Sequence, residues 1–389
     1  MKHLRKRLKG WSLKRFIERR RYWFLMKRRR RHKRRKRGVA PIPAFQQLSG
    51  DSQFLTIVDK VNYTISVGGS LVRCPKGSLI IQLPQVFDFD KNYSESAQVI
   101  DIFRRALRSG RRISYIDFER VQEVSPSCMM VFSAYAEIWK THAPKVQTKT
   151  QTWNPEVARR FSEIGFFKML GFPEPPNISP NGEIKFMPIK SSPVYLSSKA
   201  DIGHDAANLQ RSVEAFIERS LDDVRMYDSV TEAVYNVWNH AYKGVRVGRL
   251  LFKWWVSVSY DLLLNELRVI IFDYGLGIPT TMKTSTKFVV YRKLLGGTWS
   301  ESYRLYLAFE RERKRRRGIW SMSKGRGYGC PDIARLVEPS EENKVREGSS
   351  LTVISGKARY VLDGRQRRGQ KEDLSVKLQG TLIEWRMRL

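Results

Sequence analysis

The sequence has few cysteines, few histidines and few acids relative to bases. Its 389 residues include 3 Cys and 5 His, and 72 Lys or Arg outnumber 38 Asp or Glu, which gives a formal net charge of +34. Cys74, Cys128 and Cys330 are far apart, without a C-x-x-C pair or a nearby histidine cluster. This pattern does not favour a disulfide scaffold or a structural zinc site, and we expect a reduced, cytoplasmic environment.

Long apolar runs are also missing. No stretch reaches the roughly 18 to 20 apolar residues that a membrane span needs, and no uncharged segment follows the basic start as in a secretory leader. The scarcity of acids near the start leaves an organelle transit peptide as the alternative. Because 41% of the residues are hydrophobic, the chain is predicted to fold into two or three domains with cores rather than to be disordered.

The positive charge is concentrated at the start of the chain. Residues 1–38 contain 20 Lys or Arg and one acid, Glu18, which is a net of +19 and leaves +15 for the other 351 residues. Aromatic side chains such as Trp11, Phe16 and Trp23 are interleaved with the basic blocks. Basic groups bind phosphates, and aromatic rings stack on unpaired bases, so residues 2–37 are predicted to be a flexible arm that binds DNA or RNA. An anionic membrane or protein surface, and a merely solubilising tail, are the alternatives.

Residues 39–190 show alternating strand and helix patterns. This succession predicts a small α/β domain with helices packed on a sheet, and the prolines between residues 173 and 180 indicate a domain boundary. The expected strands are 78–87, 111–125 and 145–153, and the expected helices are 94–110, 126–142 and 154–170.

Residues 114–138, SYIDFERVQEVSPSCMMVFSAYAEI, resemble the STAS domain of bacterial anti-anti-sigma proteins. That family has D-S-S-G-L at the entry to a helix. Ser125 falls at the Asp position, Pro126 at the serine that is phosphorylated, and Ser127 at the next serine. The acceptor hydroxyl is therefore missing, and the resemblance implies a STAS-like fold without the phosphorylation switch. An unrelated α/β domain is the alternative.

Residues 227–242, YDSVTEAVYNVWNHAY, are predicted to form an amphipathic helix. Glu232, Asn236 and His240 recur every four residues, so they would line one helix face opposite an apolar face containing Val230 and Val234. A carboxylate can activate water, and a carboxamide oxygen can bind Mg²⁺. Taken alone, the pattern is more typical of a solvated polar face.

Three glycine-containing motifs follow. Two strand-like runs around Asn265 predict an antiparallel hairpin, and its second run ends in D-x-G-x-G-I-P, in which Asp273 can accept a hydrogen bond from an adenine amino group. SKGRGYG precedes a predicted helix and would expose backbone N–H groups suited to phosphates. The last predicted strand begins with Gly380 and Thr381. The glycines of the first two motifs are Gly275 and Gly277, then Gly325, Gly327 and Gly329.

The order of these motifs resembles the GHKL (Bergerat-fold) ATP-binding domain over residues 200–389, and locally the anti-sigma serine kinases most of all. The resemblance implies a mixed α/β sandwich, with helices on one face of the sheet, that binds ATP or ADP with Mg²⁺. By position, Glu232 would be the general base and Asn236 the Mg²⁺ ligand. Asp273 would read adenine, and Asn239 and His240 fall where relatives vary. The nucleotide-binding candidates are Asn236, Asn239, Asp273, Gly275, Gly277, Ile278, Gly325, Arg326, Gly327, Tyr328, Gly329 and Thr381.

Residues 281–324 form a long insertion between the two glycine motifs. Leu305 and Phe309 followed by the basic cluster 311–317 predict a lid helix with a basic end. Cations in the last turn also suit the helix dipole, which is the simpler explanation. As a lid, this helix would relay the nucleotide state to a bound polyanion.

Composition and resemblance together lead to one main hypothesis. The chain is expected to be an ATP/Mg²⁺-dependent switch protein and a slow ATPase that engages nucleic acid, or a nucleoprotein partner, through residues 2–37 and 311–317. A serine/threonine kinase of the anti-sigma type is one alternative, and a catalytically silent, nucleotide-bound scaffold is another. A protein partner is expected, and homo-oligomerisation is compatible with the sequence.

Overall fold

The chain folds into an N-terminal and a C-terminal set of strands, each with its own helices. The structure is a computed structural model that describes residues 53–59, 63–67, 70–109, 111–140, 148–176, 178, 182–193, 199–221, 224–242, 252–283, 299–316, 329–338, 348–366 and 368–389. The basic arm, residues 1–38, lies outside these ranges. All described elements belong to one unit, Phe54–Leu389. Within the described ranges, no helix combines the length and the apolar character that crossing a bilayer requires.

The N-terminal region is built around short parallel strands. β4 pairs in parallel with β6 and antiparallel with β1, β5 pairs in parallel with β7, and β2 and β3 form a hairpin. Helices α3 and α4 follow β5 and β7 along the chain. The elements are β1 (Leu55–Ile57), β2 (Tyr63–Val67), β3 (Ser70–Cys74), β4 (Leu79–Gln82), β5 (Val86–Phe87), α3 (Tyr93–Ser109), β6 (Ile113–Asp117), β7 (Glu123–Val124), α4 (Pro126–Lys140), η2 (Thr150–Thr152), α5 (Pro155–Glu163) and α6 (Phe166–Leu170).

Four of the expected N-terminal elements differ from the structure. The strands expected at 78–87 and 111–125 are each divided in two, the first into β4 and β5 and the second into β6 and β7. The described part of the strand expected at 145–153 contains the 3-10 turn η2, in which the Thr152 hydroxyl donates to the Lys149 carbonyl at 2.9 Å. Such local bonds compete with strand pairing. The helix expected at 154–170 is divided into α5 and α6 because Gly165 adopts a left-handed φ of 78°. The helices expected at 94–110 and 126–142 are present as α3 and α4.

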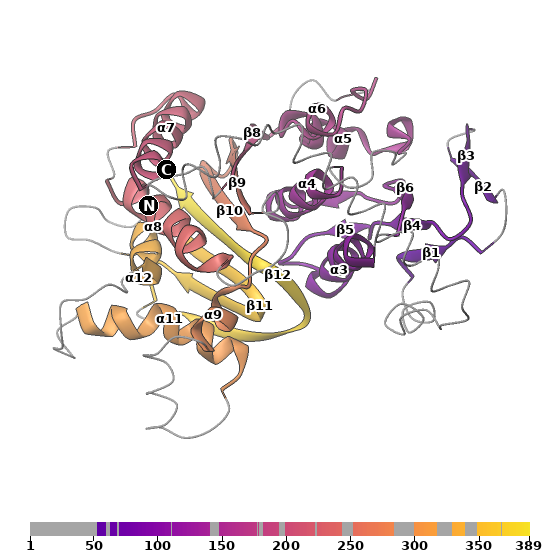
Figure 1. Ribbon diagram of the computed structural model, residues 1–389. Helices are drawn as coiled ribbons and strands as arrows, with labels where there is room; N and C mark the ends of the chain where they lie inside the picture. The colour runs from indigo at the N-terminus through magenta and orange to yellow at the C-terminus, as the bar shows by residue number, and fades with distance from the viewer. Residues whose placement is uncertain are drawn as a thin grey trace, which may run out of the picture. The chain divides into compact units, whose positions relative to one another are not determined.

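The C-terminal region contains a five-stranded sheet in the order β11-β12-β10-β9-β8 (Figure 1). All four pairings are antiparallel, whereas we expected a mixed sheet here; the parallel pairings occur in the N-terminal region. Short turns join β9 to β10 and β11 to β12, and strands joined in this way run antiparallel. The elements are β8 (Ile184–Pro193), α7 (Lys199–Ile217), α8 (Val224–Asn236), η4 (Val237–Ala241), β9 (Lys253–Asp261), β10 (Glu266–Asp273), α9 (Ile278–Lys283), α11 (Glu301–Arg316), α12 (Gly329–Ala334), η6 (Arg335–Val337), β11 (Ser350–Asp363) and β12 (Gln370–Arg388).

Strand β8 was not expected from the sequence. It pairs with β9 although it precedes residue 200, where the C-terminal domain was expected to begin. Pro188 and Pro193 make it read as a loop, but an edge strand tolerates proline because one side of its backbone needs no partner. The register shift between Met187 and Lys190 places Pro188 in an irregular part of the ladder.

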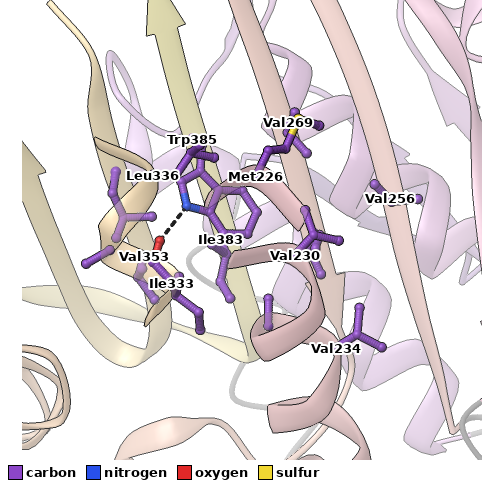
Figure 2. Packing of buried hydrophobic residues seen from close by; sticks show 14 of the residues in the cluster. Met226, Val230, Val234, Val256, Val269, Ile333, Leu336, Val353, Ile383 and Trp385 are labelled. Carbon is purple, nitrogen blue, oxygen red and sulfur yellow. Dashed lines mark hydrogen bonds between the residues drawn. The ribbon is translucent and has the colours of Figure 1, made fainter. Parts of the chain in front are cut away.

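One face of this sheet is covered by helices through a large apolar cluster. Residues from α7, α8, α11 and α12 pack against alternate residues of β9, β10, β11 and β12. Figure 2 shows Trp385 of β12 among Met226, Val230 and Ile333, with its indole Nε1 donating to the Ile333 carbonyl at 2.8 Å. Together with the N-terminal region, this arrangement confirms the expected mixed α/β class.

Candidate functional site

Helix α8 carries the polar stripe predicted from the sequence, but the stripe is shorter than expected. Glu232 and Asn236 lie four residues apart in regular helix and are both half-buried. The chain then enters the π-helical turn η4, in which the helix widens, and His240 within it is exposed. Because π-helical bonds run from i to i+5, the spacing of four no longer keeps His240 in line with the other two residues. The structure therefore groups Glu232 with Asn236 and separates His240.

Asn236 has an unsatisfied amide. Its Nδ2 atom is buried and has no hydrogen-bond partner within the described part of the chain. A buried amide without a partner costs free energy on the order of 1 to 3 kcal/mol, so such atoms tend to mark places where a ligand or water completes the bonding. Asn236 is thus a candidate contact on the end of α8.

Glu232 lies near the start of α12. Burial, followed by the negative charge of Glu232, raises the pKa of the Cys330 thiol to about 12. Cys330 is the second residue of α12, directly after the glycine-rich loop. α12 is held against α8 by the Ser229 hydroxyl, which donates to the Asp332 carbonyl at 2.8 Å. Glu232 and the start of α12 therefore lie near each other.

Asp273 ends β10 on the same face of the sheet as the helices. Side chains alternate along a strand, so Asp273 points to the side on which Ile271 and Val269 pack against α8. Its Oδ1 accepts from the Gly275 N–H at 2.7 Å, and Thr381, its register partner on β12, donates to it as well. Burial raises the pKa of the Asp273 carboxyl to about 7, even though these hydrogen bonds act to lower it. Strongly shifted carboxyls of this kind are enriched at functional sites.

The turn after Asp273 is packed against the π-helical turn η4. The Leu276 N–H donates to the Ala241 carbonyl at 2.7 Å, and a Cβ on Gly275 would lie 2.5 Å from that same oxygen. Gly277 has a φ of +82°, which favours glycine. Both glycines are thus required by close packing inside the protein, in addition to any approach of a ligand.

Ser355 was missed in the sequence, yet it joins three parts of the candidate site. Its buried hydroxyl accepts from the Ile278 N–H at 2.9 Å, donates to the Gly380 carbonyl at 3.0 Å and lies 3.1 Å from the Thr381 hydroxyl. In the sequence, the position is marked by the Ser-Gly pair at residues 355–356. In the structure, β11 shifts its register against β12 at this pair. Ser355 fixes α9, which begins at Ile278, to the start of the last strand segment.

Tyr242 was also outside the predicted set. Its hydroxyl donates to the Lys253 carbonyl at 2.5 Å and accepts from the Tyr274 N–H at 3.0 Å, and its ring stacks on Phe252 with centroids 4.6 Å apart. It therefore ties the end of η4 to the residue that follows Asp273. A tyrosine closing an amphipathic helix reads as an ordinary core residue, so the sequence contains no signal for this role.

Other predicted residues are either apart from this cluster or outside the described residues. The Asn239 side chain is exposed and donates to the Tyr235 carbonyl of its own helix at 2.9 Å. Gly329 begins α12. The residues of the glycine-rich loop that lie outside the described ranges are Gly325, Arg326, Gly327 and Tyr328.

The helix expected as a lid is anchored in the described structure. Leu305 and Phe309 of α11 are fully buried in the apolar cluster, and buried Glu310 accepts from the Tyr360 hydroxyl and the Gly369 N–H, both at 2.8 Å. Near its start, Glu301 accepts from the Lys357 N–H at 2.6 Å. Residues 301–310 are therefore a fixed wall of the C-terminal region. The basic side chains of the cluster 311–317 are not described.

Over the described residues, no group of three or more His, Cys, Asp or Glu side chains is placed to hold a metal ion. No protein-family model matches the chain, and no curated protein matches it either. The site is therefore interpreted from its own residues: an acid and a threonine paired across two strands, a tight glycine turn, and a helix that presents Asn236 and Glu232.

Proposed function

We propose that the C-terminal region binds ATP or ADP as a GHKL-type nucleotide-binding domain. The observation that carries this proposal is the buried Asp273–Thr381 pair, with Asp273 at the end of β10 and Thr381 within β12, on the sheet face covered by α8. In a GHKL domain, an acid at this place accepts from the adenine amino group. When it is ionised, the Asp273 carboxylate has lone pairs that Gly275 and Thr381 do not use. These lone pairs can accept a hydrogen bond from an exocyclic amine.

The residues of α8 fit the other end of a nucleotide. Mg²⁺ keeps several waters and is held by phosphate oxygens together with one or two protein oxygens, so a site without a cluster of acids is compatible with it. If the side-chain amide of Asn236 is rotated so that its oxygen and nitrogen exchange places, Oδ1 occupies the position of the unsatisfied Nδ2 and can bind the ion. Bound Mg²⁺ would supply charge neutralisation at the phosphates. We infer that Glu232, near the start of α12, takes a proton from an attacking water, and this makes slow ATP hydrolysis the expected reaction.

The basic segments suggest what the nucleotide state controls. A net charge of +19 on residues 1–38 favours polyanions, and the aromatic residues among the basic blocks favour unpaired bases. We therefore propose an ATP/Mg²⁺-dependent switch protein that engages nucleic acid, or a nucleoprotein partner, through residues 2–37 and 311–317. α11 connects the second segment to the sheet through Leu305 and Phe309.

The kinase alternative gains no support from the STAS-like helix of the same chain. Ser125 and Ser127 at the start of α4 are buried, and the intervening position is Pro126. A hydroxyl must reach the terminal phosphate to accept it, so neither serine is a substrate while α4 is folded in this way. A kinase function would need a substrate on another protein, and a silent scaffold would bind nucleotide without releasing phosphate.

Nucleotide binding is tested by titrating Mg²⁺-ATP into the wild type, Asp273→Asn and the matched control Asp261→Asn. Asp261 lies at the opposite end of the same β9–β10 hairpin. In Asp273→Asn, an amide N–H₂ facing the adenine amino group loses the acceptor, so affinity should fall about tenfold or more. The control should bind like the wild type. Equal affinity of all three proteins would remove Asp273 from the site, and absence of binding by the wild type would refute the proposed function.

The reaction and the polyanion role need separate assays. An ATPase is supported if the wild type releases free phosphate and Glu232→Gln does not, although it binds nucleotide with the same affinity. Transfer of the label from ATP to a partner protein would instead support a kinase. For nucleic acid, binding by the full chain and by a chain lacking residues 1–37 is compared at two salt concentrations. The truncated chain should bind more weakly and with a smaller salt dependence. Identical affinity and salt dependence would refute the role of the arm.

A further inference from the structure

Helix α4 belongs to the N-terminal region and also contacts strands β9, β10 and β12 of the C-terminal sheet. Thirteen of its fifteen residues are buried. Phe132 on this helix contacts a set of aromatic rings of the N-terminal region at centroid distances of 5.1 to 6.1 Å: Phe87, Phe103, Phe118, Phe161 and Phe166. Tyr135, three residues later, contacts the C-terminal sheet instead. α4 is therefore packed on both sides and is not a detachable surface helix.

Tyr135 touches the two residues that flank Asp273. Its ring lies 6.1 Å from that of Phe272 at an angle of 29°, and 5.0 Å from that of Tyr274 at 90°. Phe272 points away from the helix-covered face because it alternates with Asp273 along β10. Tyr135 thus supports the end of β10 from the face opposite to the one on which Asp273 points.

The same strand end is supported from the other side by Tyr242. The Tyr274 N–H donates to the Tyr242 hydroxyl, and the Asp273 carboxyl accepts from Gly275. The backbone of residues 272–274 is therefore clamped between a side chain from α4 and a side chain from the end of η4. A site that must present a carboxylate at a defined distance from a base depends on such support, since displacements of about 1 Å are costly.

A second polar contact fixes the position of α4 on this face. Glu137, two residues beyond Tyr135, accepts from Lys253 Nζ at 2.7 Å and from the indole Nε1 of buried Trp255 at 2.6 Å. Trp255 in turn packs against Phe272, with ring centroids 5.9 Å apart. The contact between α4 and the sheet is thus specific and directional, and it converges on the strand end that carries Asp273.

We propose that Tyr135 is a positioning residue of the nucleotide site, supplied by the N-terminal region, so that nucleotide binding and the packing of α4 on the sheet stabilise each other. The inference rests on the proposed function of the Asp273 site. Coupling of this kind is reciprocal. The factor by which nucleotide strengthens the packing of α4 on the sheet equals the factor by which that packing strengthens nucleotide binding. Through Tyr135, the STAS-like region would sense the nucleotide without carrying a phosphorylated serine.

The test compares Tyr135→Leu and Tyr135→Phe with the matched control Phe132→Leu, which removes an aromatic ring from the other side of the same helix. Dissociation constants for Mg²⁺-ATP and the midpoint of thermal unfolding are measured for the full-length proteins. Tyr135→Leu loses two ring contacts and should bind nucleotide about fivefold to tenfold more weakly. Tyr135→Phe keeps its ring and both ring contacts, so its dissociation constant should stay within about twofold of the wild-type value. The same is expected for Phe132→Leu, although its thermal stability should be lower.

Hydrogen exchange of the wild type provides a readout that does not depend on the folding of any variant. Amides of α4 should exchange more slowly when ATP is bound, whereas those of the distant β2–β3 hairpin should not change. Equal nucleotide affinities of Tyr135→Leu and Phe132→Leu, or unchanged exchange in α4, would overturn the coupling while the proposed function stands. Failure of the wild type to bind nucleotide would instead overturn the proposed function, and the coupling with it.

Discussion

The two faces of the five-stranded sheet are stabilised in different ways. On the face covered by α7, α8, α11 and α12, a large cluster of apolar side chains packs together, as the residues around Trp385 show (Figure 2). The opposite face combines aromatic rings with buried charge, including Glu384, which accepts from Arg386 Nε at 2.7 Å. The apolar face is stabilised by the burial of hydrophobic surface, to which many side chains contribute. The stability of the polar face depends instead on particular hydrogen-bonded and charged pairs.

The charged part of that second face joins the two regions. Asp90, which precedes α3, accepts from Arg359 and Arg386 of β11 and β12. Burial acts to raise the pKa of the Asp90 carboxyl, but the charge of Arg386 and its hydrogen bond, followed by the charge of Arg359, lower it overall. This difference between the faces leads to four predictions, ordered by the size of the expected effect.

The largest effect is expected from Trp385→Ala on the apolar face. Removing a fully buried indole leaves a cavity and should lower the free energy of unfolding by about 3 to 5 kcal/mol. Chemical denaturation measures it. Trp385→Phe keeps most of the ring volume but leaves the Ile333 carbonyl without its donor, so its loss should be clearly smaller. A loss below about 1 kcal/mol for the alanine variant would contradict the packing described for this face.

The second prediction concerns Asp273, a buried ionisable group at the edge of the apolar face. Its raised pKa means that the folded state holds its proton more tightly than the unfolded state, so wild-type stability should fall as the pH rises from about 4 to about 7. Asp273→Asn has no such proton and should become more stable than the wild type over this range. The advantage should reach a few kcal/mol above pH 7.

Unfolding curves of both proteins without nucleotide, recorded between pH 4 and pH 8, measure this difference. Parallel pH profiles for the two proteins would show that the Asp273 carboxyl is not perturbed in the folded state. The matched control is Asp261→Asn at the far end of the hairpin, recorded over the same pH range.

The third prediction tests the charged face. Asp90→Asn leaves Arg359 and Arg386 without their shared carboxylate and should lower stability at pH 7 by about 1 to 2 kcal/mol. Because the folded-state pKa of Asp90 is lowered, the wild type should lose this advantage as the pH falls below the ordinary pKa of the group. Glu119→Gln, at an exposed carboxylate of the N-terminal region, is the control and should change little. A penalty that persists at low pH would point to packing rather than charge.

The smallest effect is expected at the tip of the β9–β10 hairpin, which belongs to neither face. Leu263 is 70% exposed, and its N–H is bonded to the Asp261 carboxylate. Leu263→Ser should therefore change the free energy of unfolding by less than about 0.5 kcal/mol. Thermal unfolding at matched protein concentrations measures the change. A larger loss would show that this leucine is covered in solution.

The sequence predicted those features that depend on neighbours along the chain. Strand-like runs on either side of Asn265 predicted β9 and β10, the succession of strand-like and helix-like segments predicted α3 and α4, and the four-residue spacing of polar residues predicted α8. The same reasoning failed at residues 148–153, where the Thr152 hydroxyl donates to the Lys149 carbonyl, and it overlooked the proline-containing β8. Prediction from local sequence is least reliable at such places because edge strands and short turns contain similar residue types.

Within the candidate site, the sequence by itself determined which chemical groups are available: the carboxyl and glycines of the Asp273 turn, the amide of Asn236 and the carboxylate of Glu232. The tertiary structure decided which of them meet. It set Asp273 opposite Thr381, brought Ser355 to Ile278, and turned His240 away through the π-helical turn. It also placed Tyr135 behind the strand end. These relations join residues far apart in the chain, and strand register and helix packing, rather than any local spacing, establish them.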